Sequence, residues 1–181
     1  MQYSRCCDGE RSTMNIEARP SESADRFIAA MGMAATGVSV VTTDGQAGRF
    51  GLTVSAISSV SADPPLILAC INRKSPAVGA VSTNRLFAIN LLAAHNRDYA
   101  ETFAGRPQTG KPFDFANHQW RTGETGLPIV RDAAAVFECE LETSYEAGSH
   151  FILIGRVVAA HKGDAEPLVY CNRAFRRIVN H

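Results

Sequence analysis

The chain has 181 residues, 45% of them hydrophobic, and its 18 Lys and Arg residues equal its 18 Asp and Glu residues in number. This length suits one domain with a sizeable core, and the charge balance argues against a nucleic-acid-binding surface, which requires an excess of positive charge. No apolar run approaches the roughly 20 residues of a membrane-spanning helix, and residues 6–11 interrupt any signal-peptide core. The sequence therefore predicts a cytoplasmic protein that does not bind membranes.

The cysteines and histidines predict no metal site, because no C-x2-C pair occurs and the five histidines are scattered. Three of the five cysteines lie in or beside apolar runs, which is typical of small core residues in a reducing compartment. The cysteines are Cys6, Cys7, Cys70, Cys139 and Cys171.

The N-terminal segment differs in character from the rest of the chain. Residues 1–23 are polar and aperiodic, so we predict a disordered or loosely ordered leader, followed by a single domain over residues 24–181. Cap-forming residues at 21–25 predict a helix that continues to Met33.

The first half of this domain alternates β-leaning runs with turn signals. The pattern predicts a buried strand at 38–43, a turn at 44–48, a partner strand at 50–61, a strand at 66–71 that is apolar on both faces, a helix at 75–84 and a strand at 86–92. Because strand 66–71 is apolar on both faces, we expect both faces to be buried.

The second half predicts a helix at 95–103, strands at 133–142, 150–161 and 167–171, and a closing helix at 172–179. Residues 105–111 form a Gly- and Pro-broken loop with Arg106 and Lys111, either a mobile substrate-facing element or a plain surface connection. Short turns between strands favour a mainly β (α+β) antiparallel barrel with flanking helices, and the absence of GxGxxG after a strand excludes the usual dinucleotide-binding fold.

The stretch from Arg49 to Ser75 carries the strongest chemical signal. A run rich in Ser and Thr precedes the buried strand, and the polar, cationic segment Asn72–Ser75 follows it at once and leads into a helix. Hydroxyl groups, free amides at a helix start and cationic side chains suit the phosphate of a cofactor. The alternative is an exposed serine-rich strand followed by a basic turn.

These residues resemble the short-chain flavin reductase family, whose members have the FMN-binding split-barrel fold, an antiparallel, Greek-key-like barrel. The run Gly51–Pro65 has the pattern GxTxSAxxSVSxxPP, and C-x-N-x-K-S follows at Cys70–Ser75. The similarity extends from Phe27 to Arg177 and includes Gly37–Thr43, Phe87–Asn90, Thr125–Pro128 and Gly148-Ser149-His150. The resemblance implies an NAD(P)H:flavin oxidoreductase whose first helix packs on the barrel.

The resemblance also implies roles for individual residues. The flavin ring and ribityl chain would contact Thr53, Ser55, Ala56, Ser58 and Ser59, the phosphate would contact Asn72, Arg73, Lys74 and Ser75, and Phe87 and Asn90 would lie at the edge of the same pocket. The nicotinamide dinucleotide would contact His150, Tyr170, Asn172 and Arg173, with His150 orienting the nicotinamide and relaying a proton. By residue type alone, a lone histidine at a strand start, such as His150, is usually structural or solvent-facing, and the alternative for Tyr170 is a core aromatic residue with its hydroxyl exposed. His95, His118, His161 and His181 are interpreted as surface residues.

The implied protein is a homodimer that delivers electrons to a monooxygenase or another acceptor. The TTDGxAGRxGxTxSA segment leans toward the pyrimidine-degradation branch of the family. The alternatives are a corrinoid reductase of cobalamin synthesis and a flavin-binding protein without enzymatic activity. The sequence does not distinguish FMN from FAD, NADH from NADPH, or a bound flavin from a diffusing one.

Overall fold

The structure, a computed structural model, describes residues 24–116 and 118–178, so the expected leader at 1–23 lies outside the described residues. The helices are α1 (Ala24–Met31), α2 (Pro76–Asn84) and α3 (Arg97–Phe103). The strands are β1 (Thr36–Gly37), β2 (Ser39–Thr43), β3 (Phe50–Val54), β4 (Ile57–Ala62), β5 (Pro65–Asn72), β6 (Leu86–Leu91), β7 (Trp120–Thr122), β8 (Pro128–Val130), β9 (Ala135–Ala147), β10 (His150–Lys162), β11 (Val169–Cys171) and β12 (Ala174–Arg176). None of the helices in these ranges is long and apolar enough to cross a membrane.

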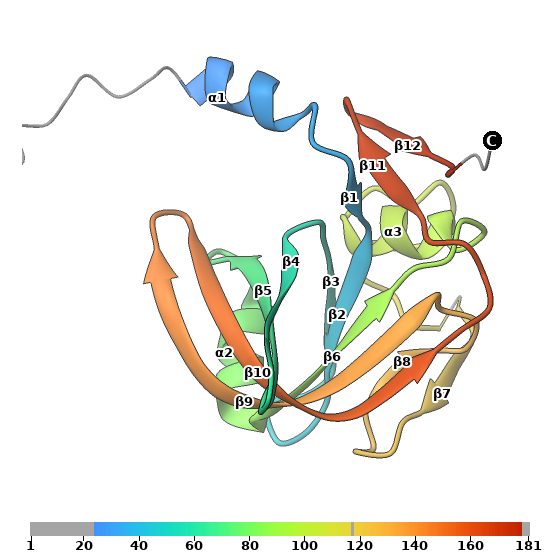
Figure 1. The fold of residues 1–181 in the computed structure, drawn as a ribbon. Coiled ribbons are helices and arrows are strands. Elements are labelled where there is room, and N and C mark those ends of the chain that lie inside the picture. The colour runs from blue at the N-terminus through green and yellow to red at the C-terminus, as the bar shows by residue number, and fades with distance from the viewer. Residues whose placement is uncertain (1–23, 117, 179–181) are drawn as a thin grey trace, which may run out of the picture.

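A seven-stranded antiparallel sheet forms the body of the molecule, in the order β3-β2-β6-β9-β10-β5-β4 (Figure 1). Its two edge strands, β3 and β4, are consecutive in the chain and are joined by only Ser55 and Ala56. A link of two residues spans at most about 11 Å. The sheet must therefore curl until its edges approach each other, which makes a barrel that is open between β3 and β4.

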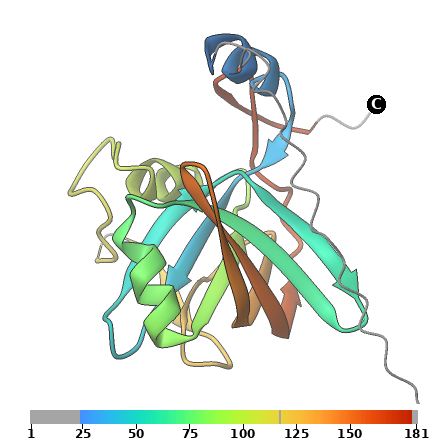
Figure 2. The ribbon, with the colours of Figure 1, turned by 90° about the vertical axis from the view of Figure 1, so that its left-hand side faces the viewer.

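Alternation along the strands divides the apolar residues between two cores. Val41 and Ile89 point into the barrel, where α2 contributes Val78 and Val81. Their sequence neighbours belong to a second core outside the barrel, which includes Val40 and Ala88 of the sheet together with residues of α3 and β8. The ribbon shows α2 and α3 against the body of the barrel (Figure 2).

The predicted strand 50–61 is wrong as a single strand. The chain bends at Ser55–Ala56, so β3 pairs with β2 whereas β4 pairs with β5 at the opposite edge of the sheet. The prediction that both faces of strand 66–71 are buried is also wrong. Ile67, Ala69 and Ile71 are buried inside the barrel, but Leu66, Leu68 and Cys70 are only partly buried on its outer face.

The predicted closing helix is a β-hairpin over the described part, to residue 178. Asn172 and Arg173 form the two-residue turn between β11 and β12, with φ angles of 49° and 58°. Positive φ at both central residues is the geometry of a tight hairpin turn, and Asn favours it. The ring of Phe175 then packs edge-on against Tyr170, with 5.5 Å between centroids.

Helix α1 does not pack on the barrel of its own chain, contrary to the expectation from the resemblance. None of its residues is buried, and Phe27, Ile28 and Met31 are 51–61% exposed. Both views show α1 standing clear of the barrel (Figures 1 and 2).

The cysteines divide by depth. Cys139 is buried in the barrel, and this burial, with the nearby charge of Glu138, raises its pKa to about 12. Cys70 and Cys171 are only partly buried, and all three are free thiols. Cys6 and Cys7 lie outside the described residues.

Candidate functional site

A cationic corner, residues 72–75, lies where β5 passes into α2. The Asn72 carboxamide accepts a hydrogen bond from the Lys74 amide at 2.9 Å, and Ser75 caps α2 by accepting from the Ala77 amide at 3.3 Å. Arg73 forms an exposed ion pair with Glu146 at 3.3 Å. Among the described residues the Lys74 ammonium group has no hydrogen-bond or ion-pair partner, so it is available to an anion.

The backbone amides of this corner are occupied, contrary to expectation. Every N–H group between Arg73 and Val78 donates to an oxygen of the chain, and Pro76 has no N–H group. A phosphate at this corner would therefore be held by side chains. The Lys74 ammonium, the Arg73 guanidinium and the Ser75 hydroxyl are the groups that fit it.

His150 lies beside the same corner. It is the first residue of β10 and pairs in register with Asn72, and its Nδ1 lies 2.9 Å from the Ser149 hydroxyl. The Ser149 carbonyl accepts from the Arg73 amide at 3.0 Å, which fixes the β9–β10 tip against the corner. The tip and the β11–β12 hairpin lie on opposite sides of the molecule (Figure 1). Within one chain His150 is therefore close to the expected phosphate residues and apart from Tyr170 and Arg173.

A cavity of about 560 Å³ lies between the end of β3, α3, the following loop and the β11–β12 hairpin. It brings together Thr53 and Ser55, expected at the flavin, with Tyr170 and Arg173, expected at the dinucleotide. The Thr53 hydroxyl donates to the Ala100 carbonyl at 2.8 Å, which ties β3 to α3. Asn172 is exposed at the hairpin turn, where its amide donates to the Gly32 carbonyl at 2.6 Å.

The other expected flavin residues are dispersed. Ala56 is exposed at the bend, and its carbonyl accepts from the Cys70 amide at 2.9 Å. Ser58 and Ser59 line a separate, mostly apolar groove on the outside of the barrel. The structure does not join these two serines to the cavity.

Phe87 and Asn90 lie in the interior rather than at a pocket edge, because both are fully buried. The Asn90 carboxamide donates to the Val40 carbonyl at 3.0 Å and accepts from the Val130 amide at 2.8 Å. The hydrogen bonds of Asn90 are satisfied within the core. Because both side chains are fully buried, neither can contact a ligand directly in this structure.

Sequence reasoning missed three polar residues of the cavity, Arg97, Glu101 and Gln108, which come from α3 and the loop after it. Arg106, which also lines the cavity, was named in the Gly- and Pro-broken loop, for which a substrate-facing role was one of two interpretations. The i,i+4 spacing of Arg97 and Glu101 indicated a helix-surface pair, but nothing local showed that α3 would face the β11–β12 hairpin.

The interpretation of the histidines as surface residues holds for His95 and is wrong for His118. The His118 side chain is 4% exposed and stacks on Tyr99, with 4.2 Å between ring centroids. His161 is partly buried, with its side chain 33% exposed. His181 lies outside the described residues.

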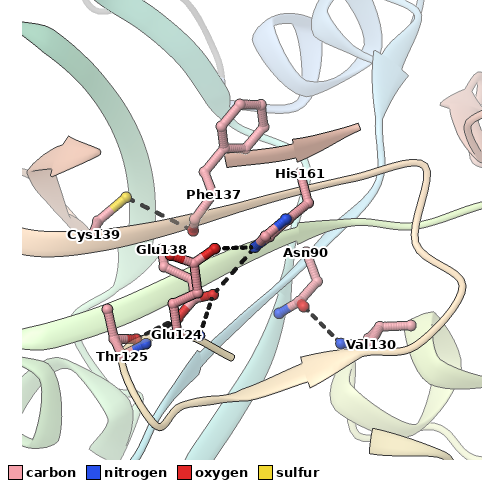
Figure 3. A network of polar contacts seen from close by, with 8 residues as sticks. All are labelled: Asn90, Glu124, Thr125, Val130, Phe137, Glu138, Cys139 and His161. Atoms are coloured by element: carbon pink, nitrogen blue, oxygen red, sulfur yellow. Dashed lines mark hydrogen bonds and ion pairs between the residues drawn. The ribbon is translucent and has the colours of Figure 1, made fainter. Parts of the chain in front are cut away.

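His161 belongs to a polar network around Glu138, a fully buried carboxylate on β9 (Figure 3). Glu138 accepts hydrogen bonds from the amides of Glu124 and Thr125, at 3.0 and 2.8 Å, and from the Thr125 hydroxyl. His161 Nε2 lies 3.3 Å from Glu124 and 3.8 Å from Glu138. Burial by itself raises the pKa of Glu138, but these hydrogen bonds and the charge of His161 outweigh it and lower that pKa.

The class of protein is established by comparison with known proteins. The family described as "Flavin reductase like domain" matches residues 31–179. The chain is 39% identical over 150 residues to a Bradyrhizobium diazoefficiens protein named FMN reductase (NADH) RutF, and the match covers 82% of each chain.

Two solved structures extend the comparison. BorF, the flavin reductase component of a bacterial two-component tryptophan halogenase, has a TM-score of 0.78 and 33% identity, covering 87% of this chain and 99% of BorF. The Streptomyces globisporus NADH:FAD oxidoreductase SgcE6, solved with NAD and FAD fragments, has a TM-score of 0.78 and 30% identity, covering 90% of this chain and 98% of SgcE6. The chain belongs to the flavin reductase like domain family, and the predicted split-barrel fold is confirmed.

Proposed function

We propose that this protein is an NADH-dependent flavin reductase that transfers a hydride to FMN and also accepts FAD. The observation that carries the proposal is the cavity at the end of β3, which joins Thr53 and Ser55 to Tyr170 and Arg173, together with the cationic corner at the start of α2. The relatives' names, FMN reductase (NADH) and NADH:FAD oxidoreductase, support this choice of cofactors. They favour a reductase over the corrinoid-reductase and non-enzymatic alternatives.

The chemistry requires positioning more than reactive side chains. Bound flavin supplies the ring that accepts the hydride. We assign the flavin phosphate to Lys74, Arg73 and the Ser75 hydroxyl, and the ring to the bend at Ser55–Ala56. His150, beside the corner, is proposed to donate a hydrogen bond at the reacting rings and to supply a proton to reduced flavin.

We also propose a homodimer. Helix α1 exposes Phe27, Ile28 and Met31, and the outer groove beside β5 exposes apolar edges of Ile57 and Phe137. A second copy that covers these surfaces would remove large apolar side chains from water. It could also bring the partner's residues close to His150 or to Arg173, which lie apart within one chain.

The acceptor of the reduced flavin is proposed to be a partner oxygenase or related flavin-dependent enzyme. The support is the description of BorF as the reductase component of a two-component system. The cytoplasmic location and the single domain at 24–181 stay predictions from the sequence.

Steady-state NADH oxidation tests the proposal, measured at 340 nm with and without added FMN. We expect flavin-dependent turnover, a lower rate with NADPH, and reduced flavin as the product under anaerobic conditions. Flavin binding without NADH oxidation would instead support the non-enzymatic alternative.

A further inference from the structure

The cationic corner at 72–75 has a carboxylate beside it. Glu146, near the end of β9, contacts Arg73 with 3.3 Å between its Oε1 and the arginine Nη1, and both side chains are more than half exposed. Lys74, the next residue, has no such partner among the described residues. One of the two cations of the corner is therefore already paired with a charge of the chain itself.

The pair reaches across a whole strand. Glu146 lies opposite Phe151 of β10, and Phe151 lies opposite Ile71 of β5, two residues before Arg73. Because β10 runs between them, β9 and β5 are roughly 10 Å apart. Residues opposite one another in register share a face of the sheet. Glu146 and Arg73 therefore meet only because both side chains are long and extend toward each other.

The contact between Glu146 and Arg73 has the geometry of an exchangeable ion pair. One guanidinium nitrogen meets one carboxylate oxygen at 3.3 Å, longer than the roughly 2.7–2.9 Å of a strong charge-assisted hydrogen bond. The pair Arg156–Glu142, between β10 and β9, has two contacts, at 3.0 and 2.7 Å. The other guanidinium nitrogens of Arg73 have no hydrogen-bond partner among the described residues.

A phosphate at this corner would compete with Glu146 for Arg73. Phosphate offers a guanidinium two parallel hydrogen bonds, a better match than the single contact with Glu146. Binding would therefore replace the carboxylate by the phosphate. The free energy of the replaced contact is subtracted from the binding of the phosphate, and a flavin without phosphate would leave the pair in place.

We propose that Glu146 is an internal competitor for the flavin phosphate, which pairs with Arg73 in the absence of ligand and gives way when the phosphate binds. The inference rests on the proposed reductase function, in which this corner holds the phosphate, and adds a residue that sets flavin affinity. Glu146 acts through Arg73 and is a positioning residue for it. A reductase that supplies reduced flavin to a second enzyme must release it, and the pair that re-forms on release favours this step.

Flavin titrations, followed by the change in flavin fluorescence, test the proposal without turnover. Glu146→Gln should bind FMN and FAD about two- to fivefold more tightly, the range expected for an exposed ion pair. Riboflavin, which lacks the phosphate, should bind as it does to the wild type. A gain in affinity separates this role from a structural one, because damage to the fold would weaken binding.

Glu142→Gln is the matched control. It also removes a carboxylate of β9 from an exposed pair with an arginine, Arg156. It should bind FMN, FAD and riboflavin like the wild type.

A double variant tests whether Glu146 acts through Arg73. In an Arg73→Gln background, Glu146→Gln should no longer tighten FMN binding, because the competition has lost its object. Added salt should narrow the difference in FMN affinity between the wild type and Glu146→Gln, since both charges of the pair are exposed and screened.

Equal FMN Kd values for the wild type and Glu146→Gln would overturn the proposal. A gain in affinity that persists in the Arg73→Gln background would also overturn it, since Glu146 would then act by direct repulsion of the phosphate. A lower KM for NADH at unchanged FMN affinity would place a nucleotide phosphate at the corner and overturn it as well. If FMN affinity rises in Glu146→Gln but the wild type oxidises no NADH, the proposed function fails and the role of Glu146 stands.

Discussion

Two polar parts of this molecule lie in opposite environments. The buried Glu138 carboxylate accepts hydrogen bonds from two amides and a hydroxyl, and the partly buried His161 imidazole lies 3.8 Å from it. At the corner 72–75 and in the cavity at the β11–β12 hairpin, the Lys74, Arg106 and Arg173 cations are exposed and lack partners among the described residues.

The difference separates a structural role from a binding role. A buried charge must be satisfied by the fold itself, or it destabilises the fold by several kcal/mol. An exposed cation costs little to leave unpaired and can be paired later by a ligand. In Figure 3 the Glu138 carboxylate fixes the turn before β8, so its hydrogen bonds are already used in the fold. The Lys74, Arg106 and Arg173 side chains, in contrast, can still donate hydrogen bonds to a ligand.

The largest effect is expected from Glu138→Ala, which removes the buried acceptor of the Glu124 and Thr125 amides. We expect the free energy of unfolding to fall by about 3–5 kcal/mol, with flavin affinity in the folded protein unchanged. Urea denaturation and flavin titration measure the two quantities. If Glu138→Ala instead weakened flavin affinity and left the free energy of unfolding unchanged, Glu138 would have a binding role rather than a structural one.

The pH dependence of stability also tests the structural role of Glu138. The pKa of Glu138 is lower in the folded protein than its usual value, so its stabilisation is complete at neutral pH. It is lost as the pH falls below the usual titration range of a glutamate and through the lowered pKa. The difference in unfolding free energy between wild type and Glu138→Gln should narrow over that range. A constant difference from pH 7 to pH 3 would contradict this.

At the corner, Lys74→Ala should weaken flavin binding by about 1–3 kcal/mol, because one charged hydrogen bond is lost. Stability should hardly change, since the side chain is exposed. Lys162→Ala, at the other end of β10, is the matched control. Ser75→Ala is less informative because Ser75 also caps α2. Equal flavin Kd values for Lys74→Ala and the control would exclude this corner as the binding site of the flavin phosphate.

His150→Ala should lower the rate of flavin reduction by about 10–100-fold through lost orientation of the reacting rings. Stopped-flow absorbance of flavin mixed with NADH reads this step. Because His150 pairs with Asn72, flavin affinity must be measured in the same variant. A changed affinity with a normal reduction rate would make His150 part of the phosphate corner only.

The smallest effect on the barrel is expected from Phe27→Glu on α1, because this helix buries none of its residues in its own chain. The variant should shift the proposed dimer toward monomer and leave the unfolding of the barrel nearly unchanged. Light scattering across a micromolar dilution series measures the shift. An unchanged dimer would exclude Phe27 from the interface, and a monomeric wild type would exclude the dimer.

Local patterns in the sequence were enough to predict most strands of the barrel, although β3 and β4 were predicted as one strand, together with helix α2 and the cationic corner that follows β5. These features depend on residues a few positions apart, through side-chain alternation, capping and turn chemistry. The closing hairpin had a local signal too, in the Asn at its turn, but it was misread as a helix.

Only the tertiary structure decided which of these segments meet. The bend at Ser55–Ala56 assigns β3 and β4 to opposite edges of the sheet, and strand register sets His150 opposite Asn72. Packing of α3 against the β11–β12 hairpin gathers three arginines from segments about 70 residues apart in sequence. Such pairings depend on how whole apolar faces pack against each other, which no window of neighbouring residues contains.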